Sequence, residues 1–513
     1  MSRDVWFHGS IAALIAASLA GCNLLAPTSK KADTTATAAT RESPPAPGPA
    51  RSVAIPAPVE KTLANGLRVI VVQRGDTPLV TSSLTILSGG EVDPAMLSGL
   101  ADFTANLLTQ GTKTRSAPQI AQVAEALGGS LSASAGWDMT AIGITVTTPK
   151  AAAALALLAD VVRNPVFAKT EVERQRAQAL DNLSVSLSQP RQLASLVAAR
   201  VAFGAAPYGH ARLGTPAALA RIRPADLVKL HATYYRPDNA VLIFAGDLDS
   251  SAAFALAEKS FGSWRKPAAK LATSGASTPD KPPTGRVVVV DLPDAGQAAV
   301  AAVRQTTARS ASDYYPGVIT NAVLGGGYSA RLNSEIRIKR GLSYGAGSRY
   351  SALRDGGSLL AIAQTKNASA TEVVELMGAE IKRLGAEPVA ATELAARKAS
   401  LIGGYSRELE TTTGLAGHIA ELVALGVDLG EINRTIASAQ AVTAEQVRTY
   451  ATTHLGLDGV DIVVVGDARQ FADALRKNYP DLELIPSSAL DLDGASLKSA
   501  VAPAPSAAQK APG

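Results

Sequence analysis

The chain has 513 residues, which at roughly 150 residues per domain is enough for two or more domains. Hydrophobic residues make up 47% and charged residues 18%, so the composition excludes a wholly disordered chain and a fibrous protein. The 49 Lys and Arg against 44 Asp and Glu leave a net charge of +5 without a basic run, so we expect no nucleic acid partner. Aromatic residues are only 4% and Ala-rich stretches are frequent, which favours a mixed α and β architecture.

The N-terminal segment is typical of an exported protein. Residues 10–20 form an apolar run too short to span a bilayer, preceded by Arg3 and followed by small residues, as in a secretory signal peptide. The run ends in Leu19-Ala20-Gly21-Cys22, which resembles the motif at which bacterial lipoproteins are cut and the cysteine receives a diacylglycerol. Cys22 is the only cysteine, so no disulfide framework competes for it.

We therefore expect a signal peptide over residues 1–21, lipidation of Cys22 and a membrane attachment through that lipid anchor. By the same resemblance, Asn23 is not the Asp that favours retention at the inner membrane, so we expect a bacterial periplasmic protein at the outer membrane. The alternative is a plain signal peptide with an incidental or buried cysteine.

Three segments lack apolar periodicity and are rich in Ala, Ser, Thr and Pro. Residues 22–51 are predicted to form a disordered tether, residues 266–284 a domain linker and residues 489–513 a disordered tail. Between them lie an N-terminal domain over 52–265 and a C-terminal domain over 285–488.

The predicted elements of the first domain follow in chain order. An Asn65-Gly66 turn before an apolar strand at 68–72 predicts a hairpin. Further strands are expected at 80–87 and 141–147, and helices at 98–108, 117–127, 151–162 and 171–187. Because strand pairs are interleaved with helices, without strict alternation, the pattern predicts an α+β fold with helices on a largely antiparallel sheet.

The two halves look like copies of each other. Moving Ile222–Asp247 along the chain by about 220 residues lays it without a gap on Val442–Asp467. Both stretches contain a helix-start signal, an amphipathic helix and an apolar strand closed by Gly-Asp. This period is too long for a solenoid, so we interpret it as domain duplication. Chance similarity of a helix followed by a strand is the alternative.

Several short motifs occur in an order that is typical of one family. In the first half they are Gly89-Gly90-Glu91, Gly99-Leu100-Ala101, Gln110-Gly111-Thr112, Leu127-Gly128-Gly129, Tyr208-Gly209-His210 and Leu213-Gly214-Thr215-Pro216. In the second half they are Leu324-Gly325-Gly326-Gly327, Arg331-Leu332, Glu335-Ile336-Arg337 and Arg340-Gly341-Leu342-Ser343-Tyr344. Over about residues 53–485 the chain resembles the insulinase or pitrilysin type of zinc peptidases, which includes the mitochondrial processing peptidases. The resemblance implies two homologous domains, each half of a clamshell.

The zinc motif is where the resemblance fails. Family members that cut peptides carry His-x-x-Glu-His on the helix after Gly-Leu-Ala, where two imidazoles share one Zn²⁺ and the Glu activates water. Those positions hold Asp102, Ala105 and Asn106 here, and Asn182 stands where the family has its third ligand, a Glu. Neutral amides are poor zinc ligands, and Ala105 cannot accept a proton.

We therefore expect a degenerate zinc site, no metal and no other cofactor on this chain, and no peptide cleavage by the chain alone. None of the histidines has a His or Glu partner at the helical spacing of a zinc motif. Two alternatives stay open: a site relocated to distant residues, and the active zinc peptidase that family membership alone suggests.

The second half keeps a different family feature. The resemblance implies that an Arg and a Tyr seven residues apart hold the substrate backbone and the carbonyl under attack, and Arg337 and Tyr344 occupy those positions. A guanidinium and a phenol are donors that can stabilise an oxyanion without metal on their own chain. The structural alternative is that Arg337 pairs with a carboxylate near Glu335 while Tyr344 packs at a strand end.

The glycine run at 325–327 lacks a following Gly-Lys-Ser/Thr, which favours a tight turn over a phosphate loop.

In the two-subunit members of the family, one chain brings the zinc helix and the other brings the Arg and Tyr. This chain resembles the second kind, which implies a homologous zinc-bearing peptidase subunit as partner, a peptide as substrate and zinc on the partner chain. A scaffolding homologue without any role in proteolysis is the competing hypothesis.

Overall fold

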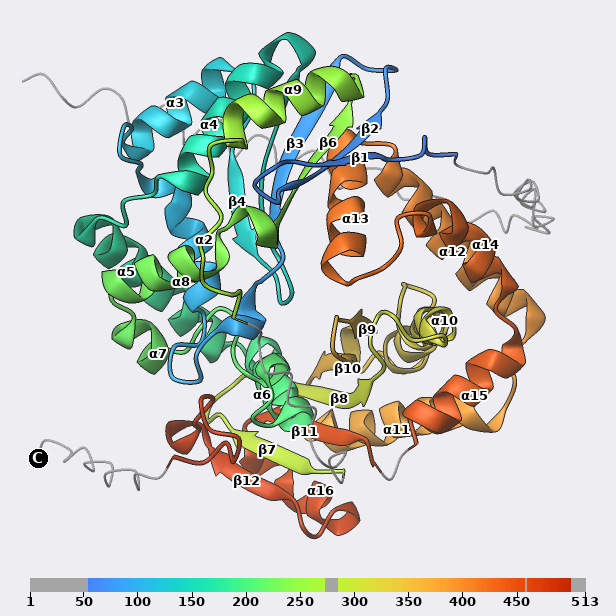
Figure 1. Cartoon of the computed structure of the whole chain (residues 1–513). Helices are drawn as coiled ribbons and strands as arrows, with labels where there is room; N and C mark the ends of the chain where they lie inside the picture. Colours follow the sequence, from blue (N-terminus) through green and yellow to red (C-terminus); the bar gives the residue numbers. More distant parts are fainter. Residues whose placement is uncertain (1–53, 273–284, 457–458, 500–513) are drawn as a thin grey trace, which may run out of the picture. The chain divides into compact units, whose positions relative to one another are not determined.

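Two six-stranded sheets, one from each half of the chain, carry the fold (Figure 1). The structure is a computed structural model, and it describes residues 54–272, 285–456 and 459–499. The predicted signal peptide, Cys22, the tether and most of the linker lie outside the described residues. The boundaries drawn between the two domains therefore stay a prediction.

The first sheet has the strand order β1-β2-β6-β3-β5-β4 and is antiparallel except for the β2–β6 pair. Its strands are β1 (Val59–Thr62), β2 (Arg68–Gln73), β3 (Leu79–Ile86), β4 (Ser132–Ala135), β5 (Thr140–Thr147) and β6 (Ala240–Gly246). The helices of this half are α2 (Leu100–Leu107), α3 (Ala117–Ala126), α4 (Ala151–Arg163), α5 (Lys169–Ser188), α6 (Pro190–Phe203), α7 (Pro216–Arg221), α8 (Pro224–Tyr234) and α9 (Ser250–Phe261).

The second sheet has the order β12-β7-β11-β8-β10-β9, with parallel β12–β7 and β7–β11 pairs. Its strands are β7 (Val287–Asp291), β8 (Ala298–Thr306), β9 (Ser343–Ala352), β10 (Gly357–Thr365), β11 (Asp461–Gly466) and β12 (Glu483–Pro486). The helices are α10 (Tyr314–Leu324), α11 (Ala370–Ala386), α12 (Ala391–Leu409), α13 (Thr412–Ala424), α14 (Glu431–Ala441), α15 (Ala444–His454) and α16 (Ala472–Asn478), with a π-helical segment η6 at Asn333–Lys339.

The sheets confirm the α+β architecture with two homologous halves. In the first sheet Gly246, at the end of β6, pairs with Gln73 of β2; in the second, Gly466 at the end of β11 pairs with Asp291 of β7. The β2–β6–β3–β5–β4 order of the first sheet thus recurs as β7–β11–β8–β10–β9. The predicted hairpin is confirmed as well, because β1 and β2 are antiparallel around Gly66, whose φ of +94° suits glycine.

One helix from each half packs against the sheet of the other half. Val69 and Val71 of β2 pack against helices of their own half, whereas Ile70 and Val72, on the opposite face, pack in a cluster with α13. On the second sheet, the face that carries Val288 and Val290 of β7 packs against α6 from the first half. Figure 1 shows α13 beside β3 and β6, and α6 beside β8 and β11. Because both faces of each sheet are covered, β6 and most of β11 are continuous apolar runs, whereas β3 includes buried Ser and Thr residues.

The segment 489–499 contradicts the prediction of a disordered tail. Leu497 is fully buried in the cluster beneath α6. The Asp493 carboxylate accepts hydrogen bonds from the hydroxyls of Ser98 at 3.2 Å and Thr215 at 2.8 Å. These apolar and carboxylate groups anchor the segment to the first half, and the Ala- and Pro-rich composition that suggested disorder starts only further along the chain.

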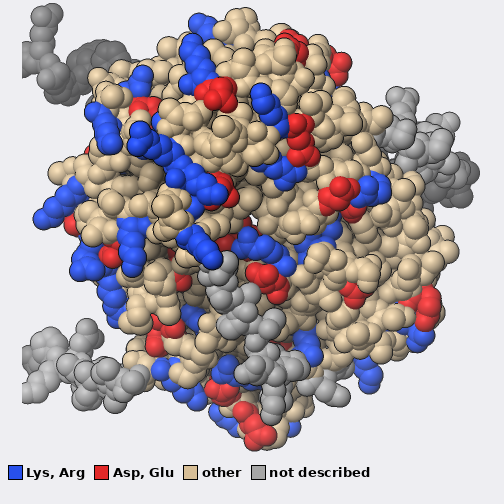
Figure 2. All heavy atoms as spheres, viewed as in Figure 1, with Lys and Arg blue, Asp and Glu red and all other residues tan. Residues whose placement is uncertain are grey.

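Charged side chains of both signs are scattered over the face shown in Figure 2. On that face, Lys and Arg side chains are interspersed with Asp and Glu over a largely uncharged surface. Of the helices that the structure describes, none combines the length and apolar character needed to cross a membrane.

Candidate functional site

Helix α2 is fixed at its N-terminus by a buried carboxylate. Asp93 accepts hydrogen bonds from the backbone N–H groups of Gly99 and Ala101, both at 2.8 Å, which satisfies donors at the start of the helix. Burial raises the pKa of the Asp93 carboxyl, although His210, with its Nε2 at 3.3 Å, opposes the shift. Gly99 has a φ of +87°, and a Cβ there would lie 2.6 Å from the backbone nitrogen of Gly214, so only glycine fits.

The degenerate zinc positions converge on one pocket. Asp102 and Asn106 are four residues apart on α2 and line a cavity of about 150 Å³, whose opposite wall is formed by Asn182 on α5. Ala105, at the position of the catalytic Glu, does not line it and is fully buried in the core of the first half. The structure therefore brings together three of the four positions that the sequence singles out.

The donor set in this pocket does not fit a zinc ion. Oδ1 of Asp102 lies 3.3 Å from an Arg212 nitrogen, and Oδ2 accepts a 2.9 Å hydrogen bond from the Asn106 amide. Burial raises the pKa of Asp102, and the Arg212 charge opposes that shift. Arg212 also donates to the carbonyl of Ala135 at the end of β4. Asp102 and Asn106 thus stand where the family has two imidazoles. Arg212 already neutralises the Asp102 carboxylate, and the Asn106 amide is uncharged.

Elsewhere in the described part of the chain, no group of three or more His, Cys, Asp or Glu side chains is arranged to hold a metal ion. His231 is close to Val162 O (2.7 Å), and burial lowers its pKa, which is typical of a structural histidine.

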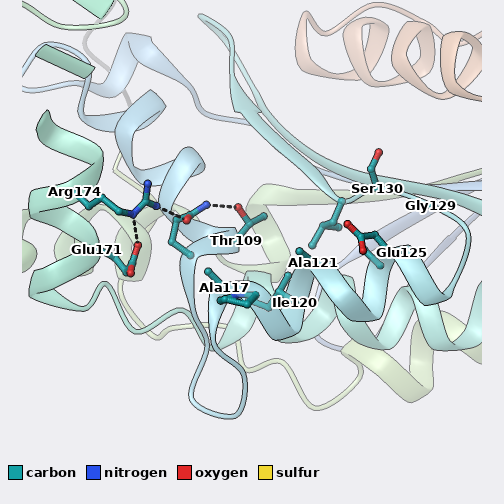
Figure 3. A pocket seen from close by; sticks show the side chains of 13 residues that line it. Thr109, Ala117, Ile120, Ala121, Glu125, Gly129, Ser130, Glu171 and Arg174 are labelled. Atoms are coloured by element: carbon teal, nitrogen blue, oxygen red, sulfur yellow. Dashed lines mark hydrogen bonds and ion pairs between the residues drawn. The ribbon is translucent and has the colours of Figure 1, made fainter. Parts of the chain in front are cut away.

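A larger cavity, of about 550 Å³, is lined by residues of α3 and α5 (Figure 3). Arg174 of α5 stands at one end and donates to Glu171 at 2.9 Å and to Gln110 at 2.7 Å. Small and apolar side chains of α3, among them Ile120, form another wall. Ser130, also in the lining, comes just before the edge strand β4. Helix α5 therefore lines both cavities, but α2 lines only the smaller one.

Arg337 and Tyr344 lie side by side in the second half. The Arg337 guanidinium carbon is 5.0 Å from the ring centroid of Tyr344 and 4.9 Å from that of Tyr328, so it is within cation–π distance of both rings. Tyr344 is 90% exposed, so it does not pack at the strand end. The carboxylate of Glu335 is engaged by Lys339 and Arg340, and no carboxylate of the described residues lies within ion-pair distance of Arg337.

Buried Asn333 holds this cluster in place. Its amide nitrogen donates to the carbonyl of Tyr328 at 2.6 Å, and its oxygen accepts from the backbone N–H of Ala346 at 3.1 Å. It therefore ties the glycine-rich loop to β9. The tight-turn interpretation of that loop holds at Gly325, where a Cβ would lie 2.2 Å from the backbone nitrogen of Ser348.

Three residues at these sites were missed by sequence reasoning. Arg212 carries no local signal, because only the folded chain brings it to Asp102. Tyr328 follows three glycines, and an aromatic residue in such a loop is a signal that could have been used. Gln178, a further carboxamide in the α2–α5 pocket, lies one turn before Asn182 on the same helix face and could have been found by its spacing.

Two family models match the chain. The model described as Insulinase (Peptidase family M16) matches residues 68–215, and the model described as Peptidase M16 inactive domain matches residues 221–401.

Similar proteins agree with these models. The chain is 27% identical over 395 residues to an uncharacterized zinc protease of Mycobacterium leprae, a match covering 76% of this chain and 87% of that protein. It is 24% identical over 351 residues to the uncharacterized zinc protease YmxG of Bacillus subtilis, covering 68% of this chain and 84% of that protein.

Solved structures show the same fold. A peptidase M16 inactive domain from Pseudomonas fluorescens superposes with a TM-score of 0.73 at 26% identity, covering 80% of this chain and 98% of that one. A protease from Helicobacter pylori gives a TM-score of 0.75 at 22% identity, over 80% of this chain and 100% of that one.

Proposed function

Because this chain belongs to the insulinase family of peptidases, family M16, we propose that it is the non-catalytic, substrate-binding subunit of a two-chain periplasmic peptidase. In this proposal a homologous partner carries the zinc ion and the catalytic base. This chain contributes Arg337 and Tyr344, which contact the peptide substrate.

The observation that carries the proposal is the contrast between the two candidate sites. In the first half, Arg212 already neutralises the carboxylate at the former metal position. In the second half, Arg337 lies close to two exposed rings without a carboxylate partner among the described residues, and the Tyr344 side chain is open to solvent. Such donors can polarise a carbonyl supplied from outside the chain.

The relatives of this chain are named zinc proteases, which supports peptide hydrolysis as the chemistry of the complex. For the location, support comes from the lipoprotein-like Leu19-Ala20-Gly21-Cys22, which lies outside the described residues. We place the complex at the outer membrane, with this chain attached through lipid on Cys22.

Reconstitution with the partner tests the function. The partner is a homologous chain with an intact His-x-x-Glu-His, to be sought first in the neighbouring reading frame. Tyr344→Phe removes one hydroxyl and should lower the rate of peptide cleavage by roughly 10²- to 10³-fold, the usual contribution of an oxyanion donor. Complex formation on a sizing column should be unchanged.

Tyr479→Phe is the matched control, because Tyr479 lies near β7 and α11, away from edge strand β9, and is only partly buried. Its cleavage rate should equal that of the wild type. Equal rates for Tyr344→Phe and the wild type would instead favour the scaffolding homologue, and loss of the complex would make Tyr344 a structural residue.

A further inference from the structure

Four carboxamides line the former metal pocket together with a larger number of apolar residues. Asn106 projects from α2, while Gln175, Gln178 and Asn182 follow one another along α5, all around the same cavity of about 150 Å³. Apolar side chains, among them Phe103, complete the lining. The pocket where the family holds zinc therefore combines uncharged hydrogen-bonding groups with an apolar lining.

Much of the hydrogen-bonding capacity of these amides is unused. The Gln178 amide nitrogen donates to Asn182 Oδ1 at 3.2 Å, and the Asn106 amide nitrogen donates to Asp102. Within the described residues, the Asn182 nitrogen, the Asn106 and Gln178 oxygens and both ends of the Gln175 amide make no hydrogen bond to protein. The pocket therefore offers donors and acceptors together.

The near-neutral charge of the pocket favours an uncharged ligand. Its one carboxylate, Asp102, lies beside Arg212, so the local charge is close to balanced. A metal ion or a strongly charged ligand gains little there, whereas an uncharged group with both an N–H and a C=O can pair with the carboxamides at each end. The main-chain amide of a peptide is such a group, and it is small enough for a cavity of this volume.

We propose that the carboxamide pocket between α2 and α5 binds a main-chain amide of an extended, uncharged peptide segment. This role rests on the proposed substrate-binding function and assigns it to the first half as well as to the Arg337 cluster. A separate, larger cavity is lined by Arg174, which directly precedes Gln175 on α5 (Figure 3). The pocket thus binds main chain at the place where related enzymes hold metal.

The test measures peptide binding to the full chain without a partner. The probe is a fluorescein-labelled peptide of roughly a dozen Ala, Ser, Thr and Gln residues, compared by fluorescence anisotropy with the same peptide N-methylated along its backbone, which lacks the amide donors. The variants are Asn106→Leu and Asn182→Leu, which keep the side-chain size at exposed positions. Gln122→Leu, an exposed carboxamide on α3 outside both cavities, is the matched control.

Each pocket variant should weaken binding of the plain peptide roughly threefold to tenfold, the effect of one lost hydrogen bond. The control should bind like the wild type, and the N-methylated peptide should bind weakly to every variant. The proposal is overturned if the pocket variants bind like the wild type, or if N-methylation leaves wild-type binding unchanged; the second comparison needs no variant to fold.

Comparing peptide binding with peptide cleavage separates the pocket proposal from the proposed function. If Asn106→Leu and Asn182→Leu bind peptide normally while Tyr344→Phe slows cleavage, the pocket proposal fails and the proposed function stands. If the pocket variants weaken binding while Tyr344→Phe cleaves normally, the pocket proposal is supported and the catalytic contribution of Tyr344 fails.

Discussion

A buried ionic network joins the two halves and makes stability depend on pH. Arg354, in the β9–β10 turn of the second half, donates to Glu91 Oε1 at 2.7 Å, and its backbone N–H donates to Asp138 Oδ2 at 3.0 Å. The Tyr208 hydroxyl donates to Asp138 Oδ1 at 2.6 Å. Glu91 and Asp138 are 5% and 3% exposed, so two carboxylates share one guanidinium with little access to water.

Burial raises the pKa of Glu91 from 4.5 to about 7, although the hydrogen bond from Arg354 opposes the shift. In the unfolded chain the same carboxyl keeps its ordinary pKa of 4.5. Between pH 4.5 and about pH 7, the folded state therefore binds the proton more tightly than the unfolded state does. The contribution of Glu91 to stability is therefore largest at low pH and is lost as pH rises through about 7. At 1.36 kcal/mol per pKa unit, the change is about 3 kcal/mol.

Glu91→Gln removes this titration while keeping the shape of the side chain. The free energy of unfolding, measured by urea denaturation at about pH 4.5 and about pH 8, should fall by about 3 kcal/mol more in the wild type than in the variant. Glu125→Gln, at an exposed position on α3, is the control and should keep the wild-type dependence. An identical pH dependence in the wild type and Glu91→Gln would refute the reasoning.

Three further predictions concern metal, anchor and tail. The purified chain should contain no stoichiometric zinc by metal analysis, and one Zn²⁺ per chain that is lost on Asp102→Ala would contradict the assignment of a degenerate site. Cys22→Ser should leave the precursor uncut and move the protein out of the membrane fraction, because one acylated residue with more than one chain anchors stably; unchanged fractionation would indicate attachment through a partner. Leu497→Ala should cost about 2–5 kcal/mol of unfolding free energy, as for other buried leucines, and a variant as stable as the wild type in urea would contradict the packing of that segment.

Local sequence patterns were sufficient for most elements of the first half. The expected helix at 151–162 forms as α4 over Ala151–Arg163, and the expected strand at 141–147 forms as β5 over Thr140–Thr147. In both, the apolar periodicity matches the face that packs on the core. Strand β4 was missed because Ser132–Ala135 alternates only small residues and has no apolar face to detect.

Long-range packing could not be predicted in the same way. The apolar faces of α6 and α13 show that both helices are buried, but not that each packs on the sheet of the other half. The pairing of Arg212 with Asp102 is likewise a contact between distant segments. The convergence of Asp102, Asn106 and Asn182 could be expected, because their spacing follows a motif whose geometry is known.

The two candidate sites differ in how their charged groups are satisfied, and this difference leaves a charged hydrogen-bond donor available to a ligand only at the second site. Asp102 has a guanidinium within 3.3 Å, and α2 stays capped without metal. Arg337 has Glu335 only two residues away, yet Lys339 and Arg340 engage that carboxylate. Stacking on an exposed ring is worth about 0.5–1 kcal/mol, similar to an exposed ion pair, so the arrangement costs little stability. It keeps the guanidinium N–H groups free, and a bound peptide carbonyl can accept from them.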